Sequence, residues 1–246
     1  MNHYTYADSN DQITSNYIRD NFTEEYWNKS EVNALNHIFD YVDEDKCSML
    51  DLGCGMGRLF SHFTNHVSSI TGVEPDYSRY TEALEEAKSY NNVTVLNGTI
   101  ENVLSNQYDL VFISHVLQHI PREKVHDIIS SVQKVLKPNG ILALTTTYTE
   151  DEDNVFGIYR EDNQSTVMDL EERNLESGES NEYGFYVRNY SFQTIQKLLE
   201  NAGFIIEKVF GFHYSNTDST KQDDINNQNQ LLHGAVDVLY IARKKD

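Results

Sequence analysis

From residue 48 onward, short apolar segments alternate with amphipathic ones, and this alternation constrains the fold more than any other feature of the chain. Apolar runs of this length, bounded mostly by glycine, aspartate or asparagine, are typical of strands that are buried on both faces of a sheet. The amphipathic segments between them are expected to form helices that cover the sheet. The sequence therefore predicts an α/β fold. The predicted strands are residues 48–52, 69–73, 93–96, 108–113, 141–147, 204–212 and 236–243.

Several helix boundaries are marked by residues with strong positional preferences. Apolar residues recur at helical spacing over 125–136, and the segment 137–140, which contains proline and glycine, ends that helix before the next strand. A second helix is expected over 80–87. A third is expected to begin at Ser191, which suits an N-cap, and to end at Gly203.

The chain has 246 residues, which is the length of one domain. The last two predicted strands have no convincing helix between them, so we expect them to be antiparallel. We expect four segments in the domain: an N-terminal helical cap over 1–45, a cofactor-binding core over 46–147, an acidic insertion or lid over 148–190, and the last helix and two strands over 191–246.

Acidic residues outnumber basic ones by 39 to 19, which leaves a formal net charge of −20. A field of this sign repels nucleic acid and anionic lipid, so we expect neither as a partner. The longest apolar runs fall far short of the ~20 residues of a membrane helix, and the first residues lack the basic start of a signal peptide. With only two cysteines, the expected location is the reducing cytoplasm.

Three glycines in five positions, Gly53, Gly55 and Gly57, follow the first predicted strand and precede a helix. Glycine lets a ligand lie against the turn, and the helix N-terminus presents free N–H groups toward it. Glu74 ends the next predicted strand, where a carboxylate can bind both hydroxyls of a ribose. This combination predicts a nucleoside site.

Two kinds of nucleoside compete for this site. A dinucleotide fingerprint has its third glycine where this chain has Arg58, which weakens a pyrophosphate interpretation. Asp51 precedes the loop, and its carboxylate suits an ammonium group better than a diphosphate. A cationic nucleoside that carries an amino acid therefore fits better, and an NAD-dependent oxidoreductase is the weaker alternative.

The segment Asp51-Leu52-Gly53-Cys54-Gly55-Met56-Gly57 resembles the first motif of class I S-adenosylmethionine-dependent methyltransferases. Val73-Glu74-Pro75-Asp76 resembles their acidic ribose motif, and segments 108–121, 136–142 and 198–204 resemble their later strands and the approaches to them. The resemblance implies a Rossmann-like sheet of seven strands in the order 3-2-1-4-5-7-6, with strand 7 antiparallel and helices on both faces. It also implies S-adenosyl-L-methionine as the cofactor.

The resemblance assigns a part of the cofactor to each motif. It places Asp51 and the glycine loop, with Cys54 as a small filler, at the methionine end, and Ser114 beneath the sulfonium. Where the family most often has an acid for the adenine amino group, this chain has Thr99. The expected cofactor-binding residues are Asp51, Gly53, Cys54, Gly55, Gly57, Glu74, Pro75, Thr99, Ile100 and Ser114, together with Tyr26 from the N-terminal helix.

Methyl transfer from a sulfonium is an in-line displacement that chiefly requires positioning, and it needs a base only when the nucleophile begins protonated. His115 and His119 follow the strand expected to lie under the methyl group, and with Tyr148 they are the candidate catalytic residues. Packing is the alternative role for both histidines. We expect no metal, because the spacing of the two histidines matches a zinc motif but lacks its glutamate.

The expected activity is methyl transfer to oxygen or nitrogen of a small molecule or a peptide-like metabolite. A protein that binds the cofactor without methylating anything is the alternative, and the oligomeric state is left open. The candidate substrate-binding residues lie in the N-terminal cap and where the insertion returns to the core: Tyr17, Trp27, Tyr186, Arg188 and Tyr190.

Overall fold

The computed structural model describes residues 24–161, 164–169, 185–213, 232 and 234–245. Its helices are α2 (Glu24–Asn36), α3 (Phe60–Phe63), α4 (Tyr77–Ala87), α5 (Arg122–Val135) and α6 (Phe192–Asn201), with 3-10 helices η1 (His37–Tyr41), η2 (Glu44–Lys46), η3 (Ile100–Val103) and η4 (Leu117–His119). Its strands are β1 (Ser48–Leu52), β2 (Ser69–Glu74), β3 (Val93–Asn97), β4 (Tyr108–Ser114), β5 (Leu136–Thr149), β6 (Asn154–Glu161), β7 (Gln164–Asp169), β8 (Phe185–Ser191), β9 (Phe204–Phe212) and β10 (Asp237–Lys244). Within these residues, no helix is both long and apolar enough to cross a membrane.

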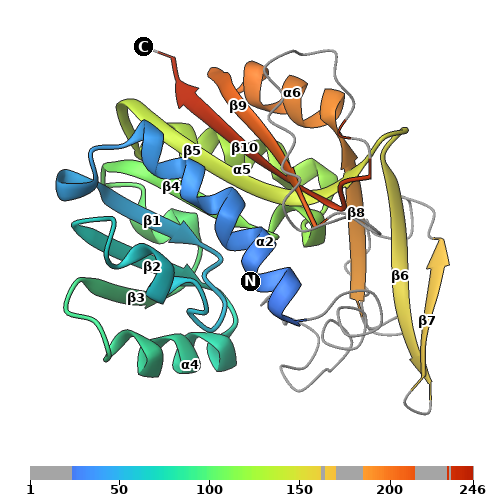
Figure 1. Cartoon of the computed structure of the whole chain (residues 1–246), viewed down its shortest axis with the longest axis horizontal. Coiled ribbons are helices and arrows are strands. Elements are labelled where there is room, and N and C mark those ends of the chain that lie inside the picture. The colour runs from blue at the N-terminus through green and yellow to red at the C-terminus, as the bar shows by residue number, and fades with distance from the viewer. Residues whose placement is uncertain (1–23, 162–163, 170–184, 214–231, 233, 246) are drawn as a thin grey trace.

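The main sheet has the predicted strand order. Strands β3, β2, β1, β4 and β5 are parallel neighbours in that sequence. Strand β10 pairs with β5, and β9 pairs with β10, both in antiparallel fashion (Figure 1). The order 3-2-1-4-5-7-6 and the antiparallel last pair are therefore confirmed.

Alternate residues of the central strands pack on opposite faces of the sheet. In β1, Leu50 belongs to a core formed with α5 and α6, whereas Met49 belongs to a core formed with α2, α3 and α4. Tyr240 and Leu239 of β10 divide between the two cores in the same way. Because helices cover both faces, these strands have the continuous apolar sequences from which they were predicted.

The predicted boundaries are close to the observed ones at both ends of α6. The hydroxyl of Ser191 accepts the N–H of Thr194, and Gly203 follows the helix with a φ of +84°.

Strand β5 begins earlier than predicted, because residues 137–140 continue the strand instead of forming a separate turn. The N-terminal helix α2 ends at Asn36 and continues into η1.

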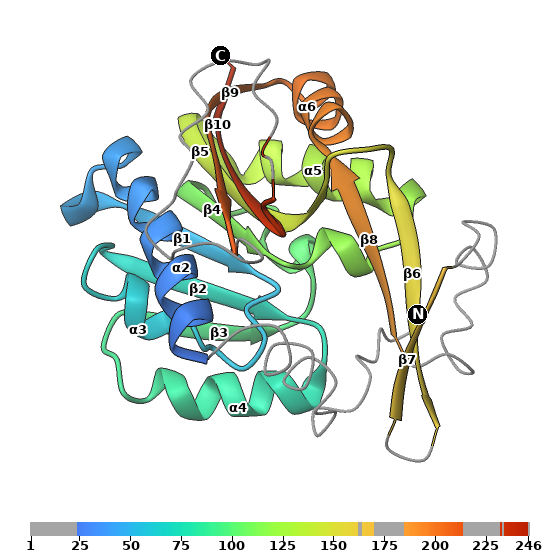
Figure 2. The same ribbon diagram turned by 45° about the vertical axis from the view of Figure 1, so that its right-hand side comes forward.

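The acidic insertion contributes further strands beside the main sheet. The end of β5 pairs in parallel with β8 through Tyr148 and Tyr190, and β6 pairs with both β8 and β7 in antiparallel fashion. Figures 1 and 2 show these three strands standing to one side of the parallel strands. The role of the insertion as a lid stays a prediction.

Candidate functional site

The glycine loop joins β1 to α3 at the carboxyl edge of the parallel strands. Gly53, Gly55 and Gly57 have φ values of +79°, +57° and +82°. A Cβ on Gly53 would lie 2.4 Å from Cγ2 of Val116, whereas a Cβ on Gly55 would meet only the guanidinium of Arg79, at 3.4 Å. Packing therefore excludes a side chain at Gly53, and the left-handed backbone disfavours one at Gly55.

Glu74 ends β2 beside this loop and is 5% exposed. One oxygen of its carboxylate accepts the N–H of Gly55 and the other accepts that of Asp76, both at 2.9 Å. Burial raises the pKa of Glu74, although these two hydrogen bonds oppose the change. Each oxygen has a second lone pair, so the carboxylate can hold the loop in shape and still accept a ribose hydroxyl.

Asp51 lies in β1 just before the loop and is 3% exposed. Burial raises its pKa to about 7, helped by the negative charge of Glu74 and opposed by the positive charge of Arg58. Its carboxylate makes no hydrogen bond with the described part of the chain. An incoming cation would stabilise such a carboxylate, so its surroundings suit an ammonium group.

The other predicted cofactor residues lie around this loop. Cys54 packs against β2, and burial strongly raises the pKa of its thiol, so it acts as a filler and not as a nucleophile. Pro75 is half-buried directly after β2, and Ser114 ends β4 at the same edge of the sheet. Thr99 is the exposed N-cap of η3, whereas Ile100 is buried in the core.

The three candidate catalytic residues differ in exposure. The side chain of His115, directly after β4, is 23% exposed, whereas His119 in η4 and Tyr148 in β5 are buried. Because η4 covers only three residues, the two histidines do not share one face of a helix. Burial raises the pKa of Tyr148, although a hydrogen bond with the backbone of Leu232 opposes the change. His115 is therefore the most accessible of the three.

The predicted substrate-binding residues of β8 lie against the segment that carries the histidines. The hydroxyl of Tyr190 donates to the carbonyl of Leu117 in η4 at 3.1 Å. Cζ of Arg188 lies 5.9 Å from the centre of the Tyr190 ring, and both residues are buried. Tyr17 lies outside the described residues, as do the side chains of Tyr26, Trp27 and Tyr186.

Two pairs of polar side chains at this edge of the sheet were not predicted from the sequence. Glu31 on α2 accepts two N–H groups of Arg58, at 2.6 and 2.9 Å. His213 follows β9 and Asp237 begins β10, and Nδ1 of His213 lies 2.6 Å from Oδ2 of Asp237. The antiparallel last pair was the available signal, because the end of β9 and the start of β10 must meet at the edge where β4 ends.

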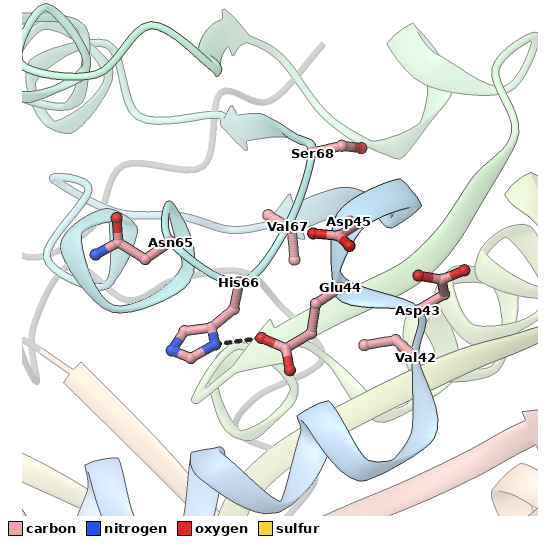
Figure 3. Close-up of a pocket in the computed structure, with 8 residues that line it drawn as sticks. All are labelled: Val42, Asp43, Glu44, Asp45, Asn65, His66, Val67 and Ser68. Carbon is pink, nitrogen blue, oxygen red and sulfur yellow. Dashed lines mark hydrogen bonds and ion pairs between the residues drawn. The ribbon is translucent and has the colours of Figure 1, made fainter.

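A cavity of about 540 Å³ lies at the opposite edge of the sheet, between η2 and the start of β2 (Figure 3). Three consecutive acids, residues 43–45, line it, and Oε2 of Glu44 lies 2.5 Å from Nδ1 of His66. Parallel strands begin at this edge, whereas ligands of open α/β sheets bind beyond the carboxyl ends of the strands. The glycine loop, and not this cavity, is therefore the candidate site.

Comparison with known proteins relates this chain to methyltransferases. Residues 50–144 match the family model of a methyltransferase domain. The ubiquinone biosynthesis O-methyltransferase of Rickettsia bellii is 26% identical to this chain over 188 residues, which are 74% of this chain and 73% of that protein. These similarities support a class I S-adenosylmethionine-dependent methyltransferase.

Solved structures of other methyltransferases share the fold of this one. An S-adenosylmethionine-dependent methyltransferase from Methanosarcina mazei has a TM-score of 0.61 at 18% identity, over 85% of this chain and 97% of that one. The 1,6-didemethyltoxoflavin-N1-methyltransferase of Burkholderia thailandensis, solved with 1,6-didemethyltoxoflavin and S-adenosylhomocysteine, has a TM-score of 0.61 at 14% identity, over 96% and 86% of the two chains.

The cofactor of this methyltransferase is S-adenosyl-L-methionine, as predicted. The residues at the glycine loop fit it, because Asp51 is a buried carboxylate without a hydrogen-bond partner in the described chain, and the cofactor carries an ammonium group. The chain is an enzyme, so both alternatives, a binding protein without activity and an NAD-dependent oxidoreductase, are set aside.

Proposed function

We propose that this methyltransferase transfers a methyl group to an oxygen or nitrogen of a small molecule, with a hydroxyl as the preferred acceptor. The observation that carries this proposal is the partly exposed His115, which follows β4 at the same edge of the sheet as the glycine loop. A hydroxyl acceptor needs a base because it begins protonated. The name of the Rickettsia relative, an O-methyltransferase, supports oxygen, and the net charge of −20 disfavours nucleic acid as acceptor.

In this proposal each motif binds a different part of the cofactor. Asp51 binds the ammonium group, Glu74 the ribose, Thr99 and Ile100 the adenine, and Ser114 lies beneath the sulfonium. When bound, the cofactor supplies a methyl group that is already activated by the positive sulfur. The acceptor lies between α2 of the N-terminal cap, the segment 115–119, Tyr148, and the end of the insertion at Arg188 and Tyr190 of β8.

The cofactor site is tested by calorimetry with S-adenosylhomocysteine on Glu74→Ala. The affinity should fall by about 1.5–3 kcal/mol, the range of hydrogen bonds to a charged group. Glu85→Ala is the matched control, because Glu85 is an exposed carboxylate on α4 that pairs with Lys88. Equal affinity of the two variants would remove Glu74 from the ribose site.

The acceptor is tested with S-adenosylmethionine carrying a labelled methyl group and a panel of small phenols, catechols, aliphatic alcohols and amines. Mass spectrometry of the products distinguishes O-methyl from N-methyl compounds. We expect transfer to a phenol or catechol at a higher kcat/KM than to any amine. Transfer to peptides alone, with no small acceptor methylated, would contradict the proposal.

A further inference from the structure

Three polar side chains far apart in the sequence meet at the carboxyl edge of the sheet. His115 follows β4, His213 follows β9, and Asp237 begins β10. Both histidines have left-handed backbones, with φ values of +54° and +55°. Residues other than glycine adopt this conformation at an energetic cost, and the surrounding structure must maintain it. We call this group the His115–Asp237–His213 cluster.

Hydrogen bonds determine which nitrogen of His115 carries the proton. The side-chain oxygen of Gln118 accepts the backbone N–H of Thr147 at 3.2 Å, and the same oxygen lies 3.2 Å from Nδ1 of His115. Oδ1 of Asp237 lies 3.7 Å from that Nδ1. Because an amide oxygen and a carboxylate only accept, Nδ1 must donate. In neutral His115 the lone pair is therefore on Nε2.

Exposure separates the three members of the cluster. The side chains of His213 and Asp237 are 0% and 1% exposed, so only His115, at 23%, is open to an acceptor. Oδ2 of Asp237 is held by His213 at 2.6 Å, whereas its buried Oδ1 has no hydrogen-bond partner in the described part of the chain. That oxygen faces Nδ1 of His115 as an ion-pair partner at 3.7 Å, while the Nδ1–H donates to Gln118 at 3.2 Å.

The charges around His115 come from several elements. Asp237 lies on β10, His213 after β9, and His119 in η4. Glu31 lies on α2. Burial raises the pKa of Glu31, but the hydrogen bond and the charge of Arg58 lower it by more, and His115 and His213 make smaller contributions in the same direction. The carboxylates of Asp237 and Glu31 both favour a positive charge on His115.

We infer that His115 is the general base of this methyltransferase through Nε2, and that Asp237, anchored by His213, is the positioning residue that orients the ring. This inference rests on the proposed function, because only a protonated acceptor needs a base. The acceptor O–H proton passes to Nε2 while the oxygen forms its bond to the methyl carbon. The carbon–sulfur bond breaks with its electron pair going to sulfur, and the imidazolium later releases the proton to water.

The first test measures the ring nitrogens of His115 by long-range proton–nitrogen NMR on protein labelled at histidine. The signals that disappear in His115→Gln identify the residue. We expect the neutral ring to carry its proton on Nδ1, with Nε2 bare. A proton on Nε2 would overturn the inference, because the lone pair would then face Gln118 and Asp237. This measurement on the wild-type chain needs no variant of Asp237 to fold.

The second test repeats the tautomer measurement in Asp237→Asn. The fraction of neutral His115 rings with the proton on Nδ1 should fall, because one of the two acceptors that face Nδ1 is then replaced by an amide. Asp127→Asn is the matched control, since Asp127 forms the same kind of pair with His126 at 3.8 Å on the surface. An unchanged His115 tautomer in Asp237→Asn would leave the cluster as packing only.

A third measurement separates this inference from the proposed function. Asp237→Asn should bind S-adenosylhomocysteine with an affinity within twofold of that of the wild type. Its kcat for a phenol that the wild type methylates should fall tenfold or more. A tenfold rise in KM for the cofactor with unchanged kcat would contradict the positioning role. Methylation confined to amines would contradict the proposed hydroxyl acceptor, whereas the tautomer of His115 would still be measured.

Discussion

At the scale of single residues, the protonation of Asp51 should control cofactor binding. Its pKa of about 7, raised first by burial and then by Glu74, leaves much of this carboxyl neutral below neutral pH. An ammonium group needs the carboxylate, so affinity for S-adenosylhomocysteine should fall up to tenfold for each pH unit below 7. Calorimetry between pH 5.5 and 8.5 measures this slope, and an affinity that does not change with pH would contradict the assignment.

The same residue makes a prediction about stability. Between pH ~4 and 7 the folded chain holds a proton on Asp51 that the unfolded chain has released, so stability should fall as the pH rises through this range. Asp51→Asn removes that cost and should raise the free energy of unfolding at pH 8 by roughly 2–4 kcal/mol. Urea unfolding at pH 5 and pH 8 measures the difference. A variant less stable than the wild type at pH 8 would show that the carboxylate is compensated.

A substitution at Gly55 can separate the effect of ligand contact from that of backbone strain. Gly55→Ala should fold, because the added Cβ meets only the flexible end of Arg79, but it should weaken S-adenosylhomocysteine binding at least tenfold. Gly203→Ala is the matched control, because Gly203 after α6 also has a positive φ, and a Cβ there would meet only the side-chain amide of Gln133, at an ordinary contact distance of 3.8 Å. Both variants should lose about 1–2 kcal/mol of stability from the backbone. Equal cofactor affinity in the two would mean that no ligand approaches Gly55.

At the scale of elements, Ser191 ties the acidic insertion to α6. Its hydroxyl caps Thr194, and its N–H and O–H both donate to Oδ1 of Asp153 at 2.9 Å. Ser191→Ala should therefore destabilise the fold by about 1–2 kcal/mol, the range of an N-cap loss. Ser78→Ala, at an exposed position near the start of α4, is the control. Denaturant midpoints that agree for the two variants would show that the cap contributes nothing.

At the scale of the whole molecule, the net charge of −20 opposes the compact state through repulsion among carboxylates. Raising NaCl from about 10 to 100 mM shortens the Debye length from ~30 to ~10 Å, so the thermal midpoint should rise by ~2–4 °C. Scanning calorimetry measures the rise. A variant with amides in place of the three acids over 43–45 should respond less to salt, and a midpoint that falls with salt would contradict the argument.

The sequence by itself determined the seven-stranded core and the place of its glycine loop. The apolar segments, the cap at Ser191 and the turn at Gly203 depend on neighbours a few residues away, so a single sequence records them. The motif from Asp51 to Gly57 is local in the same sense, and the structure places it where the strand order requires. The family resemblance rested on such segments.

Only the tertiary structure decided which distant side chains meet. Asp237 reaches His213 and His115 because β10 runs antiparallel between β5 and β9, and Glu31 reaches Arg58 because α2 covers that face. A shift of one residue in strand register would turn Asp237 to the other side of the sheet. No local pattern in the sequence encodes that register, because it follows from the packing of both faces at once.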